Sequence, residues 1–184
     1  VIAQVHGWCV GGASDYALCA DLVIASDDAV ISTPYARMWG AYLTGMWLYR
    51  LSLAKVKWHS LTGEPLTVRE AAAIELINES VPFDRLEARV AEIAARLASI
   101  PLSQLQAQKL IVNQAYENMG LASTQTLGGI LDGLMRNTPD ALAFIDTATN
   151  EGVRAAVERR DGPWGDYSQG PPDKRPDPTH VIEP

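Results

Sequence analysis

The sequence predicts an α/β fold that passes into an all-helical region. Short β-branched runs alternate with a helical segment early in the chain, an order typical of a largely parallel sheet, and helical periods take over afterwards. Six prolines in the last 24 residues remove backbone donors and oppose a regular helix there. We therefore expect an α/β region at residues 1–82, a helical region at 83–160 and an extended tail at 161–184.

Composition places the chain among ordinary globular proteins. Its 184 residues are 47% hydrophobic and 20% charged, which is enough for a substantial core without disulfides or metals. The formal net charge of −7 opposes binding to nucleic acid, and no apolar run is long enough to predict a membrane span. Cys9 and Cys19 lack zinc-ligand spacing, which favours a reducing compartment, the cytoplasm, and no bound metal.

The first segment predicts a strand, a loop and a helix. An apolar strand runs over Val1–Val5, and the glycine pair Gly11-Gly12 then precedes a helix from Ala13 to about Ala20. Two β-branched strands follow, at 22–26 and 29–32.

Helical periods dominate the remainder of the chain. Thr67 and Glu70 are spaced as a capping box, which predicts a helix start at Val68. Apolar residues on the helix expected at 121–137 exceed what one buried face needs, so we expect this surface to meet another copy of the chain. The expected helices are 43–51, 54–61, 68–75, 83–100, 102–119, 121–137 and 140–159.

The glycine pair and Asp15 form the strongest candidate for chemistry. A helix N-terminus offers unpaired N–H donors, and glycine lets a ligand oxygen approach them closely. Asp15 follows Gly12 by three residues, hence one turn along on the same face, where a carboxylate could move a proton next to a carbonyl. A purely structural alternative is that the glycines allow tight packing and that Asp15 complements the helix dipole.

Four stretches, in this order, resemble the enoyl-CoA hydratase/isomerase, or crotonase, family. They are VIAQVHGWCVGGASD with its continuation ALCADLVIAS, then LTGEPLT, LINESVP and the closing EGVRAAVERR, and they cover residues 1 to about 164. The resemblance implies a crotonase-like spiral of ββα units followed by a C-terminal helical trimerisation region.

The same resemblance implies acyl-CoA thioesters as substrates, with a thioester enolate held by two backbone N–H groups. Gly12 would supply one N–H beside Gly11, and Asp15 stands where the hydratases have their first catalytic glutamate. The second acid is absent, because the sequence TPYA places Tyr35, or Ala36 in a register shifted by one, at its position. No cofactor is implied beyond the coenzyme A of the substrate.

Aromatic side chains cluster just after this position. Trp39 and Tyr42 are candidates for the wall of a broad acyl pocket, and packing in the core or between subunits is the alternative.

The chain opens directly in an apolar strand without a methionine, and the matched motifs belong to the C-terminal part of the family domain. We therefore expect the N-terminal half of the core, with the second N–H donor, to be absent from this chain. A homotrimer or a dimer of trimers is the assembly that the resemblance implies.

The predicted activity is enoyl-CoA hydratase or dehydratase. Double-bond isomerisation is the close alternative, because one carboxylate acting twice can shift a double bond. A C–C or thioester hydrolase would need His6 as base, and a non-catalytic acyl-CoA binding protein would need no acid.

Overall fold

The computed structural model describes residues 1–164 and contains two small sheets. One has the strand order β1 (Ile2–Val5), β3 (Leu22–Ser26) and β6 (Glu79–Val81), all parallel. The other has the order β2 (Trp8–Val10), β4 (Val30–Ser32) and β5 (Leu66–Thr67). Within it β2 and β4 are parallel, and β5 is antiparallel to β4. The prediction of a largely parallel sheet is therefore confirmed.

Five helices pack around these sheets and complete what we term the α/β core, residues 1–82. Its most deeply buried apolar side chains include Leu18, Val23 and Trp47, which bring helices and strands into one cluster. The helices are α1 (Gly12–Leu18), α2 (Tyr35–Met38), α3 (Met46–Arg50), α4 (Leu53–Thr62) and α5 (Val68–Ala73).

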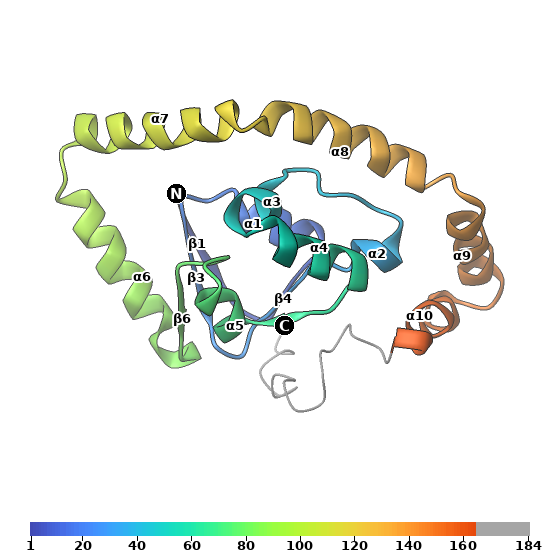
Figure 1. Ribbon diagram of the computed structural model, residues 1–184. Helices are drawn as coiled ribbons and strands as arrows, with labels where there is room; N and C mark the ends of the chain where they lie inside the picture. Colours follow the sequence, from blue (N-terminus) through green and yellow to red (C-terminus); the bar gives the residue numbers. More distant parts are fainter. Residues whose placement is uncertain (165–184) are drawn as a thin grey trace.

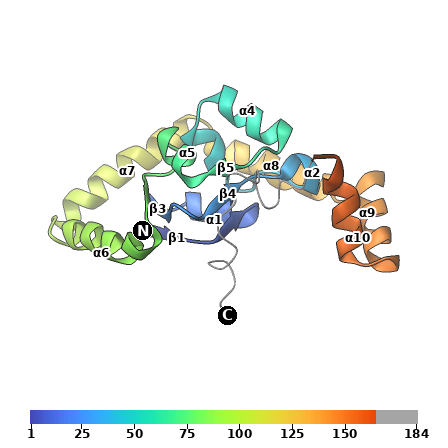
Figure 2. The ribbon, with the colours of Figure 1, turned by 90° about the horizontal axis from the view of Figure 1, so that it is seen from below.

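A helical frame, α6 to α10, runs around the α/β core in one long arc (Figure 1). The view from below shows α6 and α7 toward one end of the molecule and the paired α9 and α10 at the other (Figure 2). Its members are α6 (Phe83–Ala98), α7 (Leu102–Asn118), α8 (Leu121–Met135), α9 (Pro139–Asn150) and α10 (Val153–Asp161). None of the helices in residues 1–164 combines the length and apolar character needed to cross a bilayer.

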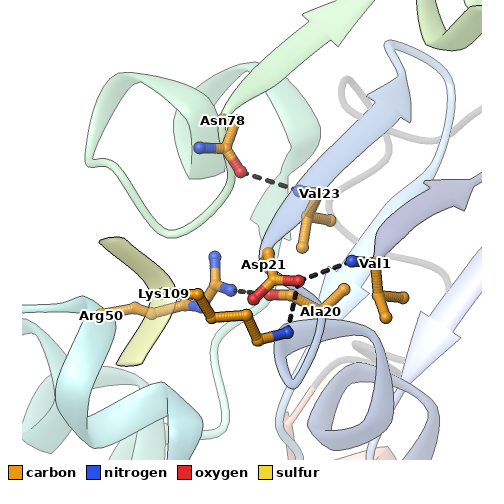
Figure 3. A network of polar contacts seen from close by, with 7 residues as sticks. All are labelled: Val1, Ala20, Asp21, Val23, Arg50, Asn78 and Lys109. Atoms are coloured by element: carbon orange, nitrogen blue, oxygen red, sulfur yellow. Dashed lines mark hydrogen bonds and ion pairs between the residues drawn. The ribbon is translucent and has the colours of Figure 1, made fainter. Parts of the chain in front are cut away.

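Polar contacts tie α7 to the core at the start of β3 (Figure 3). The Asp21 carboxylate accepts hydrogen bonds from Lys109 Nζ, at 2.7 Å, and from the amine of Val1. Arg50 donates to the carbonyl of the neighbouring Ala20. Lys109 thus attaches α7, a helix without buried residues, to the core.

Several predicted boundaries need correction. The single helix expected over 140–159 is two helices, because Gly152 adopts a positive φ of 94° between α9 and α10. Residues 8–10 form strand β2 where a loop was expected, and the short helix α2 and strands β5 and β6 were not predicted. The expectation of an extended tail is wrong for its first residues, since Asp161 ends α10 and Gly162–Trp164 form a 3-10 helix. The remainder of that tail, 165–184, lies outside the described residues.

The capping box at the start of α5 is confirmed. The Thr67 hydroxyl accepts from the Glu70 N–H, and the Glu70 carboxylate accepts from the Thr67 N–H. Each side chain thereby satisfies an N–H donor that the helix leaves without a partner.

Candidate active site

The turn that enters α1 is held in place by hydrogen bonds. Gly11 has φ 59° and ψ −125°, a conformation that glycine adopts without steric cost. Its N–H donates to the Ser32 carbonyl at 2.9 Å, and the Ser14 hydroxyl donates to the Gly11 carbonyl at 2.7 Å. Trp47 Nε1 donates in turn to Ser14 Oγ at 3.0 Å. The N–H of Gly11 is therefore already hydrogen-bonded and is not free to bind a ligand. Gly11 can favour ligand binding only because it has no side chain to block the approach.

Gly12 is the first residue of α1, one residue before the start that the sequence predicted. Its N–H has no acceptor one turn back in the helix. A Cβ built on Gly12 meets no atom within 4 Å, and the same holds for Gly11. The space beside the pair is thus open enough for a ligand to approach.

Asp15 lies one turn further along α1 and is only 1% exposed. Its Oδ2 accepts from Tyr35 Oη at 2.9 Å and from the Leu43 N–H at 3.2 Å. Its Oδ1 accepts from Thr44 Oγ1 at 3.2 Å. The carboxyl is therefore fully enclosed and oriented by three donors from one stretch of chain, α2 and the loop that follows it.

Burial raises the pKa of the Asp15 carboxyl, because a charged carboxylate loses its water. The hydrogen bonds from Tyr35, Leu43 and Thr44 act in the opposite direction, yet the pKa stays above its ordinary value. A buried carboxyl with a raised pKa can accept and return a proton more readily near neutral pH than an exposed one.

Tyr35 contacts this carboxyl directly. Burial raises the pKa of its phenol, and the charge and hydrogen bond of Asp15 raise it further. Tyr35 therefore keeps its proton at neutral pH and acts on Asp15 as a donor. The ring of Tyr42 packs edge-on against Tyr35 with centroids 5.1 Å apart, and its hydroxyl contacts Ser60 Oγ at 2.9 Å.

Trp39 lies against the helical frame. Its ring packs 5.3 Å from that of Phe144 on α9, and it lines a cavity of about 530 Å³ between α2 and the α9–α10 pair. Ala36 lines the same cavity, whereas Asp15 and Gly12 do not. The structure thus joins Tyr35 to Asp15, packs Tyr42 against Tyr35 and places Trp39 in a different contact. A cavity shared by Gly12 and Asp15 stays a prediction.

The sequence did not predict that Leu43 and Thr44 donate hydrogen bonds to Asp15. Both were expected inside a helix over 43–51, but α3 begins only at Met46, after Gly45 with a positive φ of 73°. A glycine directly after Thr44 was the signal for this later start.

His6 is exposed, and its ring lies edge-on to Phe83 with centroids 6.1 Å apart. Within residues 1–164, no three His, Cys, Asp or Glu side chains are grouped closely enough to hold a metal ion.

Comparison with known sequences decides the family. The sequence model of the enoyl-CoA hydratase/isomerase family matches residues 1–167. The chain belongs to this family. A solved enoyl-CoA hydratase from Mycobacterium smegmatis has 41% sequence identity and a TM-score of 0.84, covering 90% of this chain and 56% of its own. An enoyl-CoA hydratase/isomerase structure from Xanthobacter autotrophicus gives 29% identity and a TM-score of 0.80 over 88% and 61% of the two chains.

Curated relatives carry names of the same kind. The carnitinyl-CoA dehydratase of Escherichia coli is 28% identical over 168 residues, which are 89% of this chain and 62% of that protein. The chain spans between 39% and 62% of the length of the first relatives that it matches. The predicted crotonase fold and family membership are thereby confirmed, and the matched region is part of a longer chain in those relatives.

Proposed function

We propose that this protein acts on acyl-CoA thioesters, as an enoyl-CoA hydratase or dehydratase. The observation that carries the proposal is the buried Asp15 carboxyl one helical turn after Gly12, with open space beside the glycine pair. The names of the similar proteins, enoyl-CoA hydratases and a carnitinyl-CoA dehydratase, support the same class of substrate.

In the proposed reaction, the Gly12 N–H donates to the thioester oxygen as negative charge develops on it. Asp15 accepts a proton from water while the water oxygen bonds to the β carbon, and the thioester enolate forms. The proton then passes to the α carbon, so that one water adds across the double bond and Asp15 returns to its carboxylate. Tyr35 keeps the carboxyl oriented through its hydrogen bond to Oδ2. Coenzyme A enters as part of the substrate, and no other cofactor takes part.

Double-bond isomerisation is the second candidate, and the state of Tyr35 favours it. Because the pKa of this phenol is raised, Tyr35 is a poor proton donor, and Asp15 is the group of the pair better suited to exchange a proton. One such group is sufficient to remove a proton at one carbon and return it at another. The exposed position of His6, against Phe83, gives no comparable support to a hydrolase.

The test compares hydration and isomerisation rates on one panel of enoyl-CoA thioesters that includes bulky acyl groups. Asp15→Asn is expected to abolish both reactions. Tyr35→Phe tests the role of the phenol: hydration slows by about 10²- to 10⁴-fold if Tyr35 donates a proton, whereas a phenol that only orients Asp15 leaves hydration and one-base isomerisation little changed. Full activity of Asp15→Asn contradicts the mechanism, and an inactive parent chain that still binds thioesters favours the non-catalytic alternative.

We further propose that the chain assembles with copies of itself, as a trimer or a dimer of trimers, and acts in the cytoplasm. The apolar residues exposed on α8 support the assembly: Leu127, Ile130, Leu131 and Leu134.

A further inference from the structure

The loop between α2 and α3, residues 40–45, supplies two of the three donors to Asp15. Leu43 contributes its backbone N–H and Thr44 its hydroxyl. Thr44 Oγ1 also accepts from the Met46 N–H at 3.3 Å, so its own proton is directed at Asp15, where carboxyl Oδ1 lies at 3.2 Å and the backbone carbonyl oxygen at 3.3 Å. A shift of this loop would therefore change both hydrogen bonds at once.

Helix α8 of the helical frame holds this loop by its backbone. Gln125 Nε2 donates to the Thr44 carbonyl at 3.0 Å, and Asp132 Oδ1 accepts from the Ala41 N–H at 3.3 Å. The ion pair of Asp132 with Arg136 lowers the pKa of this carboxyl, which keeps it an acceptor at neutral pH.

Between these two contacts, Gly128 of α8 lies directly against the backbone of Tyr42 in the loop, because it has no side chain. A Cβ built on Gly128 would lie 2.2 Å from the Tyr42 carbonyl oxygen, closer than any side chain tolerates. Residues 125, 128 and 132 recur at spacings of three and four, so they share one face of α8. The next glycine, Gly129, is exposed, and a Cβ there meets nothing within 4 Å.

We propose that Thr44 and Gly128 are positioning residues: α8 presses the 40–45 loop onto the core, and the loop fixes the orientation of the Asp15 carboxyl. This inference rests on the proposed function for its catalytic meaning, whereas the geometry itself can be tested without turnover. Thr44 acts directly on Asp15, and Gly128 acts through the backbone of Tyr42.

The direction of the effect follows from electrostatics. Hydrogen bonds to a carboxylate stabilise its charged form, so the loss of a donor raises its pKa further. Two titratable side chains contact Asp15 directly: Tyr35, which donates to its carboxyl, and Cys19, whose thiol donates to its backbone carbonyl. Tyr42 lies against Tyr35, and the ion pair of Asp132 with Arg136 acts on Tyr35 from further away. Both tyrosines have raised pKa values, so the Asp15 titration is followed below the pH at which they ionise.

The experiment follows the ¹³C carboxyl resonance of Asp15 against pH in the full chain, with the signal assigned by its loss in Asp15→Asn. Thr44→Val removes the hydroxyl at nearly constant shape and is expected to raise the Asp15 midpoint. Thr44→Ser restores the hydroxyl and is expected to titrate as the parent chain does. Gly128→Ala is expected to raise the midpoint as well, since it withdraws both loop donors, whereas its neighbour Gly129→Ala leaves the midpoint unchanged.

A merely structural role would lower the melting temperature of Gly128→Ala without moving the midpoint, and that result overturns the proposal. So does a Thr44→Val chain that titrates as the parent. If Gly128→Ala does not fold, Gln125→Leu replaces it, and an unchanged midpoint there has the same meaning. A parent chain without turnover on any thioester refutes the proposed function and leaves the titration as a test of the positioning.

Discussion

The α/β core and the helical frame use their apolar residues in opposite ways. In the core, Leu18, Val23 and Trp47 are at most 1% exposed and lie in one cluster with the helix that carries Asp15. In the frame, α7 buries no residue, and Ile130 and Leu134 on α8 are each 57% exposed. The core thus builds the candidate site from its own side chains, whereas the frame presents apolar surface that a further protein surface would cover.

The frame also meets the core largely through polar contacts. Asp161 at the end of α10 pairs with Arg37 of α2, and Lys109 of α7 pairs with Asp21. These two ion pairs differ in burial, because the first is 3% and 2% exposed and the second 49% and 36%. Their removal measures how firmly each end of the frame is attached.

The largest effect is expected at the buried pair. Asp161→Ala removes the buried carboxylate that Arg37 and Arg160 share and is expected to lower the free energy of unfolding by about 3–5 kcal/mol. Chemical denaturation of the full chain measures this loss. The matched control is Glu158→Ala, which breaks the exposed pair with Arg154 and is expected to cost about 0.5 kcal/mol or less. Equal losses for the two variants would show that burial does not distinguish the pairs.

The next effect concerns assembly. Ile130→Glu places a charge in the middle of the exposed apolar face of α8 and is expected to weaken self-association at least about 30-fold, or about 2 kcal/mol. Analytical ultracentrifugation over a concentration series measures it, with Ala122→Glu on another side of α8 as control. The proposed assembly fails if the parent chain sediments as a monomer at micromolar concentration.

A smaller, pH-dependent effect is expected at Asp15. Because its folded pKa is raised, the native state holds this proton more tightly than the unfolded state does, and stability falls as pH rises from the ordinary aspartate value of 3.8 through the folded pKa. Asp15→Asn removes that loss and is expected to melt at a higher temperature than the parent chain at pH 7. Melting curves at pH 4 and pH 7 test the sign, and a larger gain at pH 4 would contradict it.

The smallest effect is expected at the exposed pair of α7. Lys109→Ala is expected to cost about 0.2–1 kcal/mol at low salt and less at high salt, since ions screen surface pairs. Urea unfolding at two ionic strengths measures the difference. A loss that is large and independent of salt would mean that α7 is held mainly by Lys109.

Local patterns were sufficient to predict much of the core from the sequence. The glycine pair gave the start of α1 within one residue, and the spacing of Thr67 and Glu70 gave the start of α5. In both places the signal and the structure it dictates lie within one turn of helix. The position of Asp15 on α1 followed from the same short-range geometry.

The partners of Asp15 could not be predicted in full, because they depend on contacts between distant segments. Thr44 reaches Asp15 from a loop that packs against α8, far along the chain, at Gly128. Asp161 was assigned to an extended tail because the prediction used the proline content of the whole segment. That average does not show that its first residue ends a helix and forms a buried ion pair. Helical periodicity likewise did not separate α9 from α10, since a single positive φ at Gly152 leaves the apolar pattern intact.

Proton exchange in deuterated water tests the central claim most directly, namely that the Asp15 carboxyl moves the substrate proton. A bound acyl-CoA is expected to exchange hydrogen at its α or γ carbon in the parent chain. Asp15→Asn is expected to stop that exchange, while calorimetry shows thioester binding nearly unchanged. Exchange that continues at the parent rate in Asp15→Asn would contradict the account.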